Sequence, residues 1–450
     1  MPDDLQNNRA PGRAVPSGRL TRLFGLGSLA TGIAGNMLAD GARNLAQGKR
    51  PRLSDMLLSP ANAHRVADKL AHMRGAAMKV GQLLSMDAGD LLPPEIGAIL
   101  ARLRADAAAM PMSQVVAVLE ANWGAGWRHQ FQQFSFTPVA AASIGQVHFG
   151  VLADGRRVAV KIQYPGVRES IDSDINNVAT LIRLSGLVPK TVDFDPLLLQ
   201  AKAQLREEAD YRHEAAALQR YRTLVAGSPD YALPEVHDAL TTDCVLTMTR
   251  MDGVPVDTLT SAPQAERDRV ATLLIGLFFR EMFAFRFIQT DPNFANYRYD
   301  RANGQLILLD FGATRLYAAE MIEHYRQIVS GAIDCDAAVI DGAAMALGYV
   351  DTATAARHRQ AVTALFIDVC EPLRTVGPYN FGTSDLAARL RDAGMALGME
   401  RDFWHTPPAD IVLLHRKIAG LYLIAARLGA RVDVRQLIGS EIDGRFHLSI

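Results

Sequence analysis

The short β-branched and aromatic runs of this chain are concentrated in one place, between Phe134 and Ile162. They read "FSFTPVA", "QVHFGVLA" and "RRVAVKI", and "ADGR" between the last two is typical of a hairpin turn. Such runs predict a small antiparallel sheet. Helical patterns follow over 167–186 and 195–226, then a strand in "DCVLTMTRMDG" and a mostly helical remainder. The pattern therefore predicts an α+β fold, with a small sheet lobe followed by a larger helical lobe.

The rest of the chain divides around these lobes. A length of 450 residues predicts about three domains. We expect a flexible or amphipathic segment over 1–50, a helical unit over 51–125 with a new helix at "PMSQ", a sheet lobe over 126–252 and a helical lobe over 253–450. Within the helical lobe, "NYRYDRANGQLILLD" predicts a hairpin with Asn303 and Gly304 at its turn.

Composition excludes several classes of function. A formal charge of −1 and a pI near 6.8 provide no basic face for nucleic acid at the level of the whole chain. Three scattered cysteines and no Cys/His cluster argue against structural zinc. The uncharged stretch from Leu23 to Ala39 contains four glycines and is shorter than the roughly 20 apolar residues of a spanning helix. We expect it to be a buried helix, or a helix that contacts a membrane surface or a partner.

Lysine is scarce in this chain. Of 47 basic residues only seven are lysines, at positions 49, 69, 79, 161, 190, 202 and 417. Codon bias explains the general preference for arginine. A lysine retained in an apolar context is nevertheless informative, because its compact ammonium can do what a guanidinium cannot.

Three polar residues in the second half of the chain have a spacing that suits phosphoryl transfer. Asp291 and Asn296 lie in "QTDPNFAN", and Asp310 follows in "LLDFGATR". In protein kinases, such an aspartate orients the attacking group, while the asparagine and second aspartate hold magnesium. Asp, Asn and Gly are also good turn formers, so each fragment alone is weak.

The upstream half of a nucleotide site is present in the expected order. "AAASIGQV" matches the kinase frame G-x-G-x-x-G-x-V if Ala140 and Ala142 replace the first two glycines, with Gly145 and Val147 retained. Lys161 follows in "VAVK" and could reach the nucleotide phosphates. An edge strand with a solvated lysine is the alternative for "VAVK" taken alone.

A carboxylate should hold this lysine. "LREEADYRHEAA" offers Glu207, Glu208, Asp210 and Glu214, of which the first, third and fourth share one face of a continuous helix. Periodicity alone cannot select the partner. An exposed charged face balanced by neighbouring arginines is the alternative.

Together these motifs resemble the UbiB/AarF family of atypical kinase-like proteins, in particular its coenzyme Q branch. The motifs that carry the resemblance extend from about residue 50 to the C-terminus. They read "KVGQ", "AAASIGQV", "VAVKIQYPGV", "EEADYRHEAA", "QTDPNFAN" and "LLDFGATR". The resemblance implies a protein-kinase-like two-lobe fold, with an N-terminal helical extension packed over the active site.

Specific roles follow from the resemblance. Lys79 and Gln82 of the K-x-G-Q motif would lie across the nucleotide pocket, although a surface lysine on a core helix is the alternative for this segment. Glu208, the first residue of the family's E-x-D motif, would pair with Lys161. The alanine-rich loop would alter the preference between ATP and ADP and restrain phosphoryl transfer.

We therefore expect Mg²⁺ with ATP or ADP as the bound group. Its phosphates would lie near Lys161 and the loop, its adenine near the strand after "DCVL", and its metal on Asn296 and Asp310, with Asp291 orienting water or an acceptor hydroxyl. The expected nucleotide-contacting residues of the loop and strand are Ala140, Ala141, Ala142, Ser143, Met248 and Met251.

Two departures from protein kinases bear on function. Gln289 stands two residues before Asp291, where kinases have histidine, and "DFGATR" leads directly into a helix-like run with no long activation loop. We expect an ATPase or small-molecule kinase that acts on prenyl-lipid precursors, or on the enzymes that modify them, in ubiquinone biosynthesis. A protein kinase and a nucleotide-gated scaffold are the alternatives. The expected location is the bacterial cytoplasm, peripheral to the inner membrane, or the mitochondrial matrix in a eukaryote.

Overall fold

The computed structural model describes residues 109–142, 144–185, 195–398 and 408–442. The chain divides into two compact units. Unit 1 comprises residues up to Ala216 together with Glu235–Arg250, and unit 2 comprises Ala217–Pro234 together with Met251–Ile450. The domain boundaries expected from the sequence, after residues 50, 125 and 252, stay predictions.

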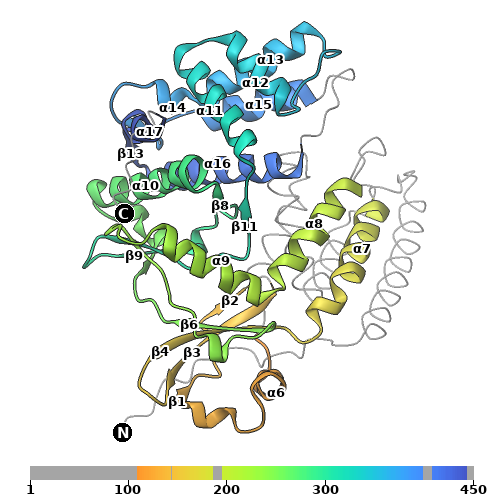
Figure 1. The fold of residues 1–450 in the computed structure, drawn as a ribbon, viewed down its shortest axis with the longest axis vertical. Coiled ribbons are helices and arrows are strands. Elements are labelled where there is room, and N and C mark those ends of the chain that lie inside the picture. The colour runs from red at the N-terminus through yellow and green to blue at the C-terminus, as the bar shows by residue number, and fades with distance from the viewer. Residues whose placement is uncertain (1–108, 143, 186–194, 399–407, 443–450) are drawn as a thin grey trace, which may run out of the picture. The chain divides into compact units, whose positions relative to one another are not determined.

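Unit 1 is built on an antiparallel sheet with the strand order β1-β3-β4-β6, in which β2 also pairs with β3 (Figure 1). The "ADGR" turn joins β3 to β4, and Gly155 takes the positive φ of 88° that glycine adopts without steric cost. The expected run over 134–140 is interrupted, because only its two ends are strand. The strands are β1 (Phe131–Phe134), β2 (Ala140–Ala141), β3 (Gly145–Leu152), β4 (Arg157–Gln163) and β6 (Val245–Thr249).

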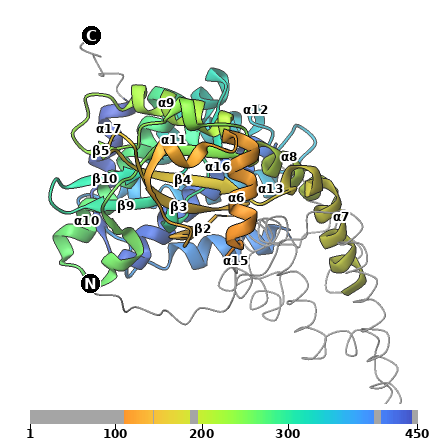
Figure 2. The ribbon, with the colours of Figure 1, turned by 90° about the horizontal axis from the view of Figure 1, so that it is seen from below.

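Helix α6 (Met112–Trp123) covers the apolar side of this sheet, and Figure 2 shows it lying against the strands. Its Val115 and Leu119 are fully buried in a core with Val158, Val160 and Ile162 of β4. The short helix η2 (Trp127–Gln130) adds Trp127 to that core. The helix expected at "PMSQ" is thus confirmed.

Three further helices follow the sheet: α7 (Val167–Ser185), α8 (Asp195–Glu208) and α9 (Tyr211–Leu224). The single helix expected over 195–226 is broken at residues 209 and 210. Asp210 Oδ1 accepts the backbone N–H groups of Arg212 and His213 at 3.1 and 3.2 Å, so this aspartate caps the start of α9.

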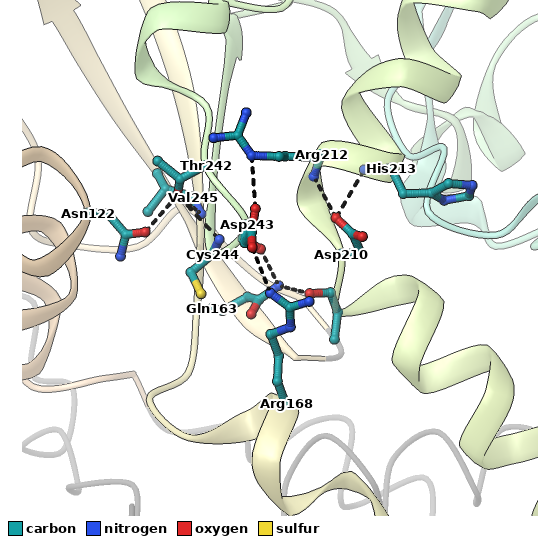
Figure 3. Close-up of polar contacts among 11 residues, drawn as sticks. Asn122, Gln163, Arg168, Asp210, Arg212, His213, Thr242, Asp243, Cys244 and Val245 are labelled. Carbon is teal, nitrogen blue, oxygen red and sulfur yellow. Dashed lines mark hydrogen bonds and ion pairs between the residues drawn. The ribbon is translucent and has the colours of Figure 1, made fainter.

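Asp243, just before β6, ties two of these helices to the sheet (Figure 3). Its carboxylate accepts Arg168 of α7 at 3.3 Å and Arg212 of α9 at 2.9 Å, while Gln163 of β4 donates to its carbonyl oxygen at 3.3 Å. The short helix η3 (Asp238–Leu240) precedes this loop. The loop therefore sets where α9 begins relative to β4.

Unit 2 is mainly helical, with small sheets at the loops that carry the predicted site. Two of these sheets have the strand orders β5-β10-β9-β7 and β11-β8, and β12 pairs with β13. The predicted hairpin with Asn303 and Gly304 at its turn is confirmed, since β9 and β10 flank these residues. The strands are β5 (Tyr231–Ala232), β7 (Val254–Pro255), β8 (Phe287–Gln289), β9 (Tyr297–Asp300), β10 (Gln305–Leu308), β11 (Thr314–Leu316), β12 (Tyr379–Asn380) and β13 (Arg431–Val432).

The helices of unit 2 form two groups. α10 contacts α16 and α17, while α11, α12, α13 and α15 pack together (Figure 1). α10 continues into a π-helical turn, η5 (Arg280–Phe285), immediately before β8. The helices are η4 (Val256–Ser261), α10 (Gln264–Phe279), η6 (Phe294–Asn296), α11 (Ala319–Asp334), α12 (Ala337–Ala346), α13 (Ala356–Val369), α14 (Glu371–Arg374), α15 (Leu386–Gly398), α16 (Ala409–Leu428) and α17 (Val434–Ile442). Within the described ranges, no helix has both the length and the apolar character needed to cross a bilayer.

Candidate functional site

Lys161 is held by a buried carboxylate within unit 1. It lies in the middle of the sheet, on β4, opposite Val147 of β3 and Leu246 of β6. Its Nζ donates to both carboxylate oxygens of Glu214, at 2.9 and 2.8 Å. The two side chains are only 10% and 2% exposed, so the pair is poorly screened by water. The solvated edge-strand alternative for "VAVK" is therefore excluded.

The partner expected for this lysine was Glu208, whereas the carboxylate whose contact the structure gives is that of Glu214; a role for Glu208 in the site stays a prediction. Glu208 is the last residue of α8, whereas Glu214 lies in the first turn of α9. Because the chain turns at Asp210, the two glutamates belong to different helices and do not follow one helical periodicity. Glu208 is itself buried, with 9% of its surface exposed.

The alanine-rich segment of unit 1 forms a tight hairpin turn. Ala140 pairs with Val147 and Ala141 with Gln146, and the Ala142 N–H donates to the Gly145 carbonyl at 2.8 Å. The side chains of Ala140 and Ala141 are exposed, and Ser143 lies outside the described residues. The described part of this segment therefore presents exposed methyl groups on a backbone that pairs with β3, and its contact with a nucleotide stays a prediction.

Met248 and Met251 flank the point where the chain passes from one unit to the other, between Arg250 and Met251. Met248 lies opposite Ala159 of β4 and is 6% exposed. Met251 is half-buried in unit 2. The expected contact of both residues with an adenine ring stays a prediction.

Asp291 and Asn296 are brought together in unit 2, in the loop between β8 and β9. Asn296 Nδ2 donates to the Asp291 carbonyl oxygen at 2.9 Å and to its Oδ2 at 3.1 Å. Arg416 Nη2 donates to the other carboxylate oxygen, Oδ1, at 2.6 Å. Because the Asn296 amide nitrogen is used in this way, its Oδ1 is the atom left to accept a cation.

Asp310 lies in a second loop that contacts the first. Its Oδ1 accepts the Gly312 N–H at 3.0 Å, which shapes a tight turn. The preceding Leu309 donates its N–H to the Asn296 carbonyl at 3.1 Å. β8 also pairs with β11, and Gln289 lies opposite Thr314. The strand that precedes Asp291 is therefore paired with the strand that follows Asp310. The three residues predicted from spacing thus share one region of unit 2.

A buried ionic network behind these loops escaped the sequence analysis. Glu281 of η5 accepts the Tyr221 hydroxyl at 2.7 Å and the Gln289 N–H at 3.0 Å, and Lys417 lies 3.2 Å from its other oxygen. Lys417 also donates to Gln289 Oε1 at 3.3 Å and to the Tyr297 hydroxyl at 3.4 Å. Gln289, found where kinases have histidine, therefore anchors the loop through this network.

Burial and charge oppose each other at Lys417. Burial alone lowers the pKa of this ammonium, but the Glu281 carboxylate and Tyr297 raise it above its ordinary value. Burial, with Glu281 beside it, likewise raises the pKa of the Tyr221 hydroxyl. Lys417 is therefore a charged lysine in an apolar interior, and its rarity among the basic residues was the one sequence signal that could have found it.

Comparison with known proteins decides the family. Residues 102–343 match the family model described as the ABC1 atypical kinase-like domain, which is more than half of the chain. This chain belongs to the ABC1 atypical kinase-like family. The UbiB/AarF resemblance inferred from the motifs is thereby confirmed.

Relatives of this ABC1 family member match over most of its length. The atypical kinase COQ8 of Saccharomyces cerevisiae, described as mitochondrial, is 38% identical over 94% of this chain and 85% of that protein. The mitochondrial atypical kinase COQ8B of Rattus norvegicus is 38% identical over 96% of this chain and 82% of that protein. The solved complex of Rv3197 with erythromycin from Mycobacterium tuberculosis has a TM-score of 0.58 at 25% identity, covering 85% of this chain and 96% of that one. The predicted α+β fold, with a sheet lobe and a helical lobe, is confirmed.

Two residues expected in the site of this ABC1 protein cannot be placed. Lys79 and Gln82 lie outside the described residues, as do the expected helical extension up to residue 108 and the Leu23 to Ala39 segment. Their roles stay predictions.

Proposed function

We propose that this protein is an atypical kinase-like ATPase that binds Mg-ATP or Mg-ADP and supports ubiquinone (coenzyme Q) biosynthesis. It acts on prenyl-lipid precursors, or on the enzymes that modify them, at a membrane surface. The names of its relatives support the proposal, since proteins 37% to 38% identical over most of the chain are described as atypical kinases of the COQ8 type.

The observation that carries the proposal is the buried pair of Lys161 and Glu214. An ammonium held by two charge-assisted bonds on a central strand is fixed in direction. That is what a group needs in order to hold a polyphosphate, and an ordinary surface lysine lacks it. Lys161 contacts the phosphates, and Glu214 positions Lys161.

The loops of unit 2 supply the oxygen donors for a cation. Asn296 Oδ1 and the Asp310 carboxylate are hard oxygen ligands of the kind that Mg²⁺ takes together with phosphate oxygens and water. The described residues contain no cluster of three or more His, Cys, Asp or Glu side chains suited to a metal, which fits a cation bound mainly through its nucleotide. When bound, the cation neutralises phosphate charge. Asn296 and Asp310 hold it, and Asp291 orients the attacking oxygen.

A small acceptor or water fits the chain better than a protein substrate. After Phe311 the chain forms β11 within a few residues, and α11 begins at Ala319. A long activation segment, which docks peptides in protein kinases, has no room in that interval. A nucleotide-gated scaffold needs only to bind the nucleotide. Phosphate release that is lost when a metal ligand is changed would therefore indicate catalysis.

We place the protein at the inner face of a bacterial inner membrane, or at the equivalent matrix face of a mitochondrion. The mitochondrial descriptions of its relatives support the second of these locations. Contact with the membrane would be peripheral, and ubiquinone-biosynthesis enzymes are the proposed partners.

The experiment is a phosphate-release assay on the purified chain. It is run without lipid, with anionic-lipid vesicles, and with vesicles that also carry a quinone-precursor mimic. We expect lipid-stimulated release that falls by about 100-fold or more in Asp310→Asn, because the cation loses a carboxylate ligand.

The matched control is Asp385→Asn, since Asp385 has a side chain that is 76% exposed and pairs with Arg389 on the surface. Labelled ATP in the same reactions reports transfer to protein. Labelled protein without free phosphate would favour the protein-kinase alternative. If cells that carry Asp310→Asn make as much ubiquinone as cells that carry the parent protein, the scaffold alternative replaces the proposal.

A further inference from the structure

Helix α16 contacts the Asp291 loop through three residues in just over one helical turn. Arg416 reaches Asp291, Lys417 reaches Gln289, and Gly420 packs against Pro292. These contacts join positions about 125 residues apart in sequence. No short-range motif predicts them.

The contact of Arg416 with Asp291 is unusually buried for an arginine. The Arg416 side chain is 3% exposed and that of Asp291 is 21% exposed, with Nη2 and Oδ1 2.6 Å apart. Asn296 occupies the other carboxylate oxygen at 3.1 Å. Both oxygens of Asp291 are therefore held, and its carboxylate cannot rotate without breaking one of these bonds.

Stability alone is a poor explanation for this arginine. Arg416 Nε and Nη1 are buried and have no hydrogen-bond partner among the described residues. Burying a charge with unpaired N–H groups is unfavourable, and apolar side chains of similar volume are often as good or better for folding. Orientation of Asp291 is what the guanidinium provides and an apolar residue would not.

The backbone on both sides of Asp291 is fixed by the same helix. Lys417 donates to Gln289 Oε1 at 3.3 Å, and Gln289 Nε2 donates to the Asp291 carbonyl at 3.0 Å. At Gly420, an added Cβ would lie 2.1 Å from Pro292 Cγ, so only glycine allows the helix to approach this closely. The loop is thus held by α16 at residues 289, 291 and 292.

We propose that Arg416 is the positioning residue of Asp291, with α16 serving as the brace of the Asp291 loop in place of the histidine that kinases use. The proposal rests on the proposed function, because it takes Asp291 as the group that orients the attacking oxygen. Arg416 acts through the carboxylate and needs no contact with nucleotide.

The test compares Arg416→Gln, Arg416→Lys and Asp291→Asn with the double variant Arg416→Gln/Asp291→Asn. Phosphate release yields kcat and KM, calorimetry with Mg-ADP yields Kd, and thermal unfolding reports the fold. Arg391→Gln is the matched control, because Arg391 is exposed on α15 and lies 3.1 Å from its neighbour Asp392.

We expect Arg416→Gln to lower kcat by about 10- to 100-fold, the range typical of residues that orient a catalytic group, with KM and the Mg-ADP Kd little changed. Arg416→Lys should retain more activity than Arg416→Gln, since lysine keeps the positive charge although it lacks the planar guanidinium group. In the Asp291→Asn background, Arg416→Gln should cost little further, because both changes remove the same arrangement.

Additive losses in the double variant would overturn the proposal, as would a normal kcat in Arg416→Gln beside a slow Asp291→Asn. If Arg416→Gln does not fold, the Arg416→Lys variant tests the proposal in its place. Weakened Mg-ADP binding together with a lower melting temperature would mark Arg416 as a packing residue and overturn the proposal. A lower kcat alone would support it. Wild-type release by Asp291→Asn would refute the role of Asp291 in the proposed function, a result distinct from all of these.

Discussion

Replacing Glu214 by glutamine should remove the carboxylate charge that faces the buried Lys161 ammonium at hydrogen-bond distance. The two side chains are 10% and 2% exposed and share bonds of 2.9 and 2.8 Å. Removing one partner of a buried ion pair costs about 3–5 kcal/mol. Glutamine keeps one acceptor oxygen, so we expect a loss near the lower limit, about 3 kcal/mol. At roughly 2–4 °C per kcal/mol, the thermal midpoint should fall by about 6–12 °C.

A double-mutant cycle isolates the pair from other effects of the substitution. Glu214→Gln, Lys161→Met and the double variant are compared by thermal unfolding and by titration with Mg-ADP. Once the ammonium is gone, removing the carboxylate should cost far less, so most of the loss should appear as coupling energy. Mg-ADP affinity should fall by about tenfold in Glu214→Gln, because Lys161 loses its direction.

Glu208→Gln, tested in the same cycle, is the discriminating comparison. We expect a smaller coupling to Lys161 than that of Glu214, since the bidentate contact is with Glu214. Equal or larger coupling for Glu208, or an unchanged midpoint in Glu214→Gln, would refute the assignment of Glu214.

Three other perturbations test separate parts of the structure. Gly145→Ala places a Cβ 2.2 Å from the Ile162 carbonyl oxygen and should destabilise by about 1–3 kcal/mol or more in denaturant unfolding, whereas Gly342→Ala, with open space around it, should not. Burial lowers the pKa of His415 from 6.5 to about 4, so its contribution to stability is complete above pH 6.5 and is lost as pH falls towards 4. By pH 5 the free energy of unfolding should have fallen by about 2 kcal/mol through this histidine, and this fall should be absent in His415→Phe. Equal losses of stability in the parent and in His415→Phe would contradict the prediction. Ala140→Gly should change the ratio of ATP to ADP affinity and expose self-phosphorylation, and calorimetric affinities equal to the parent's would exclude that role.

The elements that sequence predicted well are those set by neighbouring residues. "ADGR" and Asn303-Gly304 form the expected hairpin turns, because their backbone preferences act over a few residues. Asp291 and Asn296 meet as expected, since five residues around a short η6 turn bring the amide back to the carboxylate.

The partner of Lys161 could not be chosen in this way. Grouping Glu207, Asp210 and Glu214 on one face assumed an unbroken helix, yet Asp210 caps a new helix, so Glu214 no longer shares the periodicity of α8. The new helix starts where Asp243, about thirty residues further on, binds Arg212. Hydrophobic and charge periodicity carry no sign of this break, because its signal is a single capping residue, Asp210, and the contact of Asp243 with Arg212 supports it from further along the chain.

By itself, then, the chain's order of residues determined the α+β class and the turns, because dihedral preferences and turn chemistry act locally, and its motifs led to the hypothesis of which carboxylates, amide and lysine meet a nucleotide. Tertiary structure alone decided that Glu214 holds Lys161 and that Arg416 and Lys417 of α16 hold the Asp291 loop. The physical reason is that a buried charge must find an opposite charge close by in space, and chain separation does not limit which one it finds.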